Sequence, residues 1–127
     1  MPPAKTEFTR AVRLVPMISC ADVEAALSLY RDELGFTVSD THVEDGRLIW
    51  CLAKAGATEV MFQHHPKQAA RNGGVVLWVY VNDVDALHAR LIGKGYKVDA
   101  PDTEHGRREC EMTDRDGNPV ILCQVLS

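Results

Sequence analysis

The sequence lacks the cysteine spacing of a disulfide framework or a structural zinc site. Its four cysteines, Cys20, Cys51, Cys110 and Cys123, are scattered, with no CxxC pair. Each lies in an apolar or strand-like stretch, so the pattern favours buried free thiols in a reducing cytoplasm. No apolar run approaches the roughly 20 residues that span a bilayer. Residues 1–10 also lack the apolar stretch of a secretory signal, so we expect a cytoplasmic protein.

The chain has no surplus of basic residues either. Asp and Glu number 18 against 14 Lys and Arg, for a net charge of −4. A nucleic-acid or anionic-membrane partner would normally require a basic surface, so neither is expected. GxSxG, GxGxxG and HExxH motifs are missing, and the sequence predicts no catalytic residue and no cofactor. With 127 residues, 46% of them hydrophobic, the chain is long enough for one domain with a real core.

The first half of the chain contains a strand, a helix and three further strands. Residues 12–19 are branched and apolar, with Pro16 indicating an edge position or a bulge. Asp22 is a good N-cap for a helix that Gly35 would close in the left-handed conformation. Strand patterns then follow at 36–43, at 47–55 after an Asp-Gly turn, and at 58–65 after Gly56.

The second half repeats this order. A strand at 75–81 precedes Asp83, an N-cap, and a helix ending near Gly95, and strands are predicted at 96–100, 107–114 and 118–125. The two halves match at an offset of 60 or 61 residues. We therefore predict an α+β fold: a tandem βαβββ repeat whose curved mixed sheet surrounds a shared cleft, with both helices outside. Residues 1–11 form a flexible lead-in, and 12–127 form one domain of two units, 12–65 and 75–125, joined by a linker at 66–74.

Two stretches carry a resemblance to a known family. One is LSLYRDELGF at the end of the first helix, and the other is HGRRECEMTDRDGNPVIL, with an Arg-Glu pair before an Asp-x-Asp-Gly-Asn turn. In order and spacing they resemble the vicinal-oxygen-chelate superfamily of glyoxalases, extradiol dioxygenases, fosfomycin-resistance enzymes and bleomycin-resistance proteins. The resemblance covers residues 12–125 and implies a small-molecule site in a cleft.

In the metal-dependent members of that superfamily, four inward-facing side chains hold a divalent ion. The resemblance places the equivalent positions at Val15, Met61, Val76 and Ile121. None of these side chains suits a hard divalent ion, which binds carboxylate oxygen or imidazole nitrogen. A two-residue shift in the alignment would bring Glu59 inward and still leave three aliphatic neighbours. We therefore predict no metal site at these positions, which argues against glyoxalase, dioxygenase and thiol-transferase chemistry.

Strand alternation predicts which side chains line the cleft. If Val76 points inward, Trp78 and Tyr80 do so too, while alternate residues pack under the helices. A planar ring could stack on this aromatic pair, and methionines adapt to irregular ligands. The interpretation that Trp78 and Tyr80 fill a closed core or a dimer interface stays open. The full set of predicted ligand-binding residues is Met17, Met61, Gln63, His65, Trp78, Tyr80, Ile121 and Cys123.

Other polar residues give weaker indications. His64 and His65 are adjacent in a strand, so they point to opposite faces and cannot easily share an ion. Arg108 and Glu109 likewise face opposite ways and are expected to pair across strands. Trp50 alternates with Leu48 and Leu52, and we expect a core position for it.

These observations favour a metal-free protein that sequesters an apolar or aromatic small molecule, as bleomycin-resistance proteins do, and so confers antibiotic resistance. Two alternatives stay open. One is a metal-dependent lyase, isomerase or dioxygenase with ligands such as Glu59, His65, His105 or Glu111, and the other is an interaction module with a filled cleft. A homodimer is expected, because closed two-fold pairs are common and the family builds clefts beside such interfaces. Whether the two units close within one chain or exchange between chains is left open.

Overall fold

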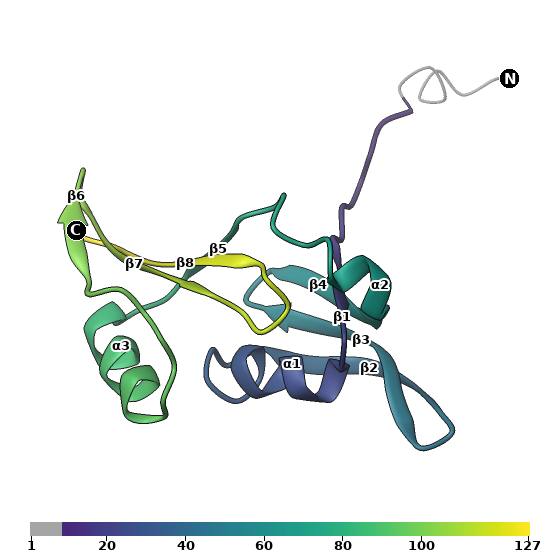
Figure 1. Ribbon diagram of the computed structural model, residues 1–127. Coiled ribbons are helices and arrows are strands. Elements are labelled where there is room, and N and C mark those ends of the chain that lie inside the picture. Colours follow the sequence, from purple (N-terminus) through teal and green to yellow (C-terminus); the bar gives the residue numbers. More distant parts are fainter. Residues whose placement is uncertain (1–8) are drawn as a thin grey trace, which may run out of the picture.

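The computed structural model describes residues 9–127, which form two modules side by side (Figure 1). The first contains β1 (Met17–Cys20), α1 (Val23–Tyr30), β2 (Thr37–Glu44), β3 (Arg47–Ala55) and β4 (Thr58–His64). The second contains β5 (Leu77–Tyr80), α3 (Val84–Gly93), β6 (Asp102–Glu104), β7 (Arg107–Thr113) and β8 (Pro119–Val125). The predicted α+β repeat of two βαβββ units is confirmed. The predicted lead-in at 1–11 lies mostly outside the described residues.

Each module has its own four-stranded mixed sheet. The strand order is β1-β4-β3-β2 in the first sheet and β5-β8-β7-β6 in the second. In both, the edge strand before the helix runs parallel to the last strand of the module, and the other pairs are antiparallel. The chain therefore holds two separate sheets and not one continuous curved sheet.

Both helices begin where the caps predict and α3 ends just before Gly95, but α1 ends at Tyr30 and a turn at 31–34 leads to Gly35. The Asp22 carboxylate accepts a hydrogen bond from the Ala25 amide at 3.1 Å, and Asp83 does the same for Ala86 at 3.0 Å. Gly35 and Gly95 take left-handed conformations, with φ of 81° and 91°. A side chain there would be strained, so these glycines allow the chain to leave each helix toward the next strand.

Some predicted element limits are wrong. The first strand starts only at Met17, because Pro16 has no N–H to donate, although its carbonyl accepts a hydrogen bond from the Met61 amide at 2.8 Å. The strand predicted at 96–100 is absent: Val98 makes one isolated bridge to Met112, and β6 forms after Pro101. The predicted linker at 66–74 contains a short helix, α2 (Pro66–Ala69).

One hydrophobic core runs through both modules. In the first, α1 covers the sheet face that carries Cys51, Ala53, Val60 and Phe62, and Tyr30 contacts Phe62 with ring centroids 4.9 Å apart. In the second, α3 covers Cys110, Met112, Val120 and Leu122. All four cysteines are free and buried, as predicted. Among the described residues, no helix is long and apolar enough to cross a membrane.

Polar side chains connect the modules at two places. The Tyr30 hydroxyl donates to Asp114 Oδ2 at 2.6 Å, and the amide of Ala21 donates to Asp116 Oδ1 at 2.9 Å. Both aspartates belong to the turn between β7 and β8.

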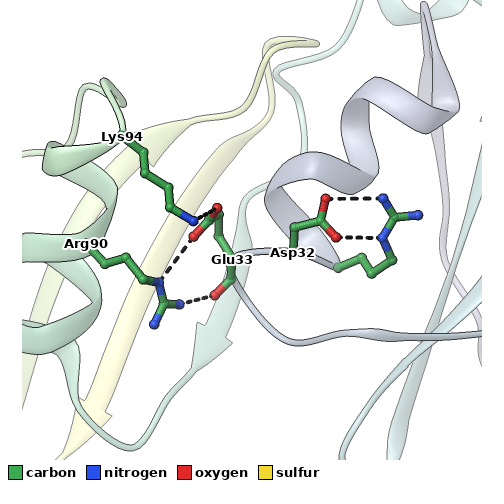
Figure 2. Close-up of polar contacts among 5 residues, drawn as sticks. Asp32, Glu33, Arg90 and Lys94 are labelled. Carbon is green, nitrogen blue, oxygen red and sulfur yellow. Dashed lines mark hydrogen bonds and ion pairs between the residues drawn. The ribbon is translucent and has the colours of Figure 1, made fainter.

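The second connection is made by Glu33, whose side chain is only 6% exposed. Figure 2 shows its carboxylate between two cations of the second module, Arg90 at 3.2 Å and Lys94 at 2.7 Å. Neighbouring Asp32 points the other way, toward Arg31. The two modules are therefore held in one arrangement by directional contacts as well as by the shared core.

Candidate functional site

The face of each sheet that its helix leaves uncovered is called here the open face. On the first sheet, register places Met17, Met61 and Leu52 in one row, and Ser19, Gln63 and Trp50 in the next. Directly opposed residues in neighbouring strands share a face. The 3.0 Å hydrogen bond from Gln63 Nε2 to Ser19 Oγ confirms this placement. These rows of the open face therefore combine apolar side chains with polar ones, and Ser19 and Gln63 at their centre satisfy each other.

Trp50 lies on this open face, which corrects the expected core position. Its neighbours Cys51 and Ala53 are the residues that pack fully buried under α1. Alternation then sends Trp50 to the opposite face, where it is half-buried beside Gln63. Side-chain size suggests the reverse assignment, because a buried tryptophan removes more apolar surface from water than a cysteine or an alanine does.

The open face of the second sheet carries the aromatic pair. Register places Trp78 next to Ile121 of β8, which in turn lies next to Glu111 of β7. Tyr80 lies next to Cys123, which lies next to Glu109. Trp78 is 45% exposed and Tyr80 is 62% exposed, whereas Leu77 and Val79 pack against the core. Alternation therefore predicted the facing of this strand correctly, and neither aromatic ring is part of the hydrophobic core.

Besides Gln63, three of the remaining predicted site residues lie on the open faces. Met17 is 49% exposed, and Met61 and Ile121 are partly buried. Two others are less available. His65 lies beyond the end of β4, and its Nδ1 accepts a hydrogen bond from the Gln68 amide at 3.1 Å, so the ring caps α2. Cys123 has the expected register but no exposed surface.

The cysteine thiols are poorly suited to nucleophilic chemistry. Burial raises the pKa of Cys110 to about 11, and it also raises the pKa of Cys51 and Cys123. The pKa of Cys20 rises too, first from burial and then from the nearby Asp116 and Asp114. A thiol with a raised pKa is protonated at neutral pH, whereas the thiolate is the reactive form.

The positions that hold a metal in related proteins do not fit one here. Met61 and Ile121 lie on the open faces, and Val15 and Val76 precede β1 and β5. Three aliphatic groups and one thioether do not coordinate a hard divalent ion. The other ligand set considered is dispersed: Glu59 pairs with Arg13, His65 caps α2, and His105 sits in an exposed turn. Within residues 9–127, no group of three or more His, Cys, Asp or Glu is placed to hold a metal.

A cavity lies between the modules, lined in part by residues that alternation assigned to the core. Its volume is about 520 Å³, and its walls include Ile18, Tyr30 and Val60 of the first module and Leu77 and Val79 of the second. Trp78 also reaches it. The lining of this cavity cannot be predicted from local sequence patterns, because it depends on how the two modules pack. Trp78 thus lies where an open sheet face meets the seam between the modules.

Comparisons with known proteins agree with this architecture. TnmS3, described as an antibiotic binding protein from Streptomyces sp. CB03234, is 26% identical, with a TM-score of 0.69 over 92% of this chain and 99% of that one. A glyoxalase/bleomycin resistance protein from the same organism is 25% identical, with a TM-score of 0.65 over 85% and 96%. A bleomycin-binding protein complexed with bleomycin shares the fold at 17% identity, with a TM-score of 0.66 over 90% and 98%.

No similar protein was found among curated proteins. The family model of the Glyoxalase/Bleomycin resistance protein/Dioxygenase superfamily matches residues 12–122. That match covers both modules, including the α1 segment and the turn between β7 and β8. The chain belongs to this superfamily.

Proposed function

We propose that this chain is a metal-free binding protein that sequesters a small apolar or aromatic molecule at its open sheet faces. The observation that carries the proposal is the exposure of Trp78 and Tyr80 on one strand, next to apolar Ile121. Exposed aromatic rings beside a few polar groups are typical of small-molecule sites. Protection against a toxic compound would then follow from mass action, with no bond broken.

The comparisons support the ligand class. TnmS3 is described as an antibiotic binding protein, and this chain covers 99% of its length. Val15, Met61, Val76 and Ile121 offer no oxygen or nitrogen ligand for a divalent metal. Their chemistry therefore supports a binding function rather than metal-dependent turnover. Antibiotic sequestration is therefore the role that we favour.

We further propose a homodimer in which a second copy docks beside the open faces and leaves room for the ligand. Val12 is 94% exposed and Leu14 is 83% exposed in the segment that leads away from β1 (Figure 1). β1 and β5 are edge strands, so each also leaves one row of backbone groups unpaired in its sheet. Sedimentation should give twice the chain mass of 14.1 kDa. A monomer at all micromolar concentrations would remove the dimer from the proposal.

The binding proposal is tested with acridine, a neutral planar probe. Titration into the Trp50→Phe protein should quench the fluorescence of Trp78, and calorimetry should give a dissociation constant. Trp78→Ala should abolish binding without unfolding the protein, and Ile92→Ala, which removes an exposed apolar side chain from α3, should bind normally. No binding by the parent protein would overturn the proposal. Stoichiometric zinc, iron, nickel or manganese in protein purified without chelator would overturn its metal-free part.

A further inference from the structure

We infer that the ligand of the proposed site is a planar aromatic cation. This inference rests on the proposed function and narrows its ligand class. Two independent features of the second sheet carry it. Carboxylates lie across the sheet from the aromatic residues, and a cation of the protein itself stacks on the ring of Trp78.

The carboxylates continue the rows that the aromatic residues start. Moving across the sheet from Trp78, register passes through Ile121 to Glu111. From Tyr80 it passes through Cys123 to Glu109 and then to Asp102 on β6. Each row therefore runs from an aromatic ring through a small apolar side chain to a carboxylate.

A cavity of about 240 Å³ opens at the carboxylate end. Its walls include Asp99, Asp102, Glu104, Glu109 and Glu111, together with Ile121. Within the part of the chain that the structure describes, no Lys, Arg or His lines this cavity. A ligand that rests on Trp78 and Tyr80 and extends over Ile121 would thus place its far end among carboxylates. Coulomb attraction there favours a positive group and disfavours an anion.

Arg107 shows that the ring accepts a planar cation. Its guanidinium carbon lies 5.8 Å from the centroid of the Trp78 ring, within the range of a cation–π interaction. Arg107 Nε also lies 3.5 Å from Glu109 Oε2. The guanidinium therefore stands where the inferred ligand would lie, between an aromatic face and a carboxylate.

The contacts of Arg107 are incomplete, which makes the guanidinium displaceable. Arg107 Nε and Glu109 Oε2 are both buried and lie 3.5 Å apart without forming a hydrogen bond, and neither has another hydrogen-bond partner. The next residue, Arg108, differs: it donates two hydrogen bonds to Asp85, at 2.8 and 2.9 Å, on the helix side of the sheet. A buried carboxylate oxygen without a donor is unfavourable. A ligand cation with an N–H aimed at Glu109 would satisfy that oxygen and release Arg107 to solvent.

The experiment compares three probes with the same tricyclic ring: 9-aminoacridine, a cation at neutral pH; acridine, which is neutral; and acridine-9-carboxylate, an anion. Calorimetry on the full chain should give at least about tenfold tighter binding of the cation than of acridine, and weaker binding of the anion. Added salt should weaken binding of the cation and leave that of acridine unchanged, since salt screens only the charged ligand.

Substitutions locate the charge recognition. Glu109→Gln combined with Glu111→Gln should remove the preference for the cation while acridine binds as before. Asp85→Asn, which removes one carboxylate on the far side of the sheet, is the matched control and should keep the preference. Arg107→Gln should tighten binding of 9-aminoacridine more than that of acridine, because it frees the ring and removes a like charge.

The outcomes separate this inference from the proposed function. Equal binding of acridine and 9-aminoacridine would overturn the inference of a cationic ligand and leave the binding function standing. So would tight binding of acridine-9-carboxylate to the parent that is lost in Arg107→Gln. A cation preference that survives the double glutamate substitution would overturn the role of the carboxylates. Failure of all three probes to bind would overturn the proposed function itself.

Discussion

The two modules share a fold but differ in how they use aromatic residues. In the first, Tyr30 of α1 packs in the core against Phe36 and Phe62, with ring centroids 5.6 and 4.9 Å away, whereas Trp50 lies on the open face. In the second, the largest fully buried side chains are Leu91 and Leu122, and the aromatic pair Trp78 and Tyr80 faces outward.

This difference indicates a division of labour between the halves of the repeat. A buried aromatic cluster makes the first module the better-packed half, because aromatic rings bury large areas and gain further from ring contacts. The second module packs a smaller aliphatic core and places Trp78 and Tyr80 outside it. On this division, aromatic truncation should destabilise the first module and impair binding in the second. The four predictions below test this, ordered by their effect on the free energy of unfolding.

Phe62→Ala should have the largest effect. Phe62 has no exposed surface and contacts Tyr30, so truncation leaves a cavity in the core and should lower the free energy of unfolding by about 3–5 kcal/mol. Urea denaturation followed by circular dichroism measures it. A loss no greater than that of Trp78→Ala would break the comparison between the modules.

Tyr30→Phe tests the contact between the modules. The change keeps the ring in its cluster and removes only the hydroxyl that donates to buried Asp114. A loss of about 1–3 kcal/mol is expected, since a buried carboxylate gives up one of its donors. Tyr96→Phe, at a partly buried tyrosine of the second module, is the control and should be nearly neutral. Equal effects of the two variants would show that the contact does not stabilise the pair.

Glu33→Gln should show a pH-dependent loss. Hydrogen bonds from Lys94 and then from Arg90 hold the pKa of the Glu33 carboxyl below its usual value, although burial opposes them. Because the folded pKa is lowered, this stabilisation is present above the ordinary pKa of a glutamate and is lost as pH falls through the lowered value.

At neutral pH we expect Glu33→Gln to lose about 1 kcal/mol, because both partner cations are half exposed. The denaturation midpoints of the parent and the variant should converge in acid. Asp32→Asn, which alters an exposed ion pair with Arg31, is the adjacent control and should show a smaller difference at neutral pH. A gap that stays constant into acid would rule out the charge as its cause.

Trp78→Ala should have the smallest effect on stability, below about 1 kcal/mol, because the ring is 45% exposed and lies outside the core. Its effect on acridine binding should nevertheless be the largest of the four variants. A loss of stability near 3–5 kcal/mol would instead assign the ring a core role. That result would remove the main support for the proposed site.

Local signals in the sequence predicted much of this arrangement. Asp22 and Asp83 marked the helix starts and Gly95 the end of α3, because capping and left-handed turns depend on a few neighbouring atoms. Alternation gave the correct facing of Trp78 and Tyr80 for the same reason.

What the sequence could not provide depends on tertiary packing. Trp50 was expected in the core, but small Cys51 and Ala53 take the face under α1. The strand expected at 96–100 forms instead at Asp102–Glu104, since pairing with β7 decides it. The cation on Trp78 and the seam between the modules involve residues far apart in the chain. Only the assembled structure brings them together.

The Asp114–Asn118 turn has a consequence for how many modules can associate. It reaches from the second module to Tyr30 and Ala21 of the first. The corresponding turn of the first module, around Gly56 between Ala55 and Ala57, has no carboxylate to make the reverse contact. If both turns carried the aspartates, each module could hold the next, and such head-to-tail contacts generate rings or open-ended filaments. Because only one turn carries them, the assembly of modules through this contact stops at two.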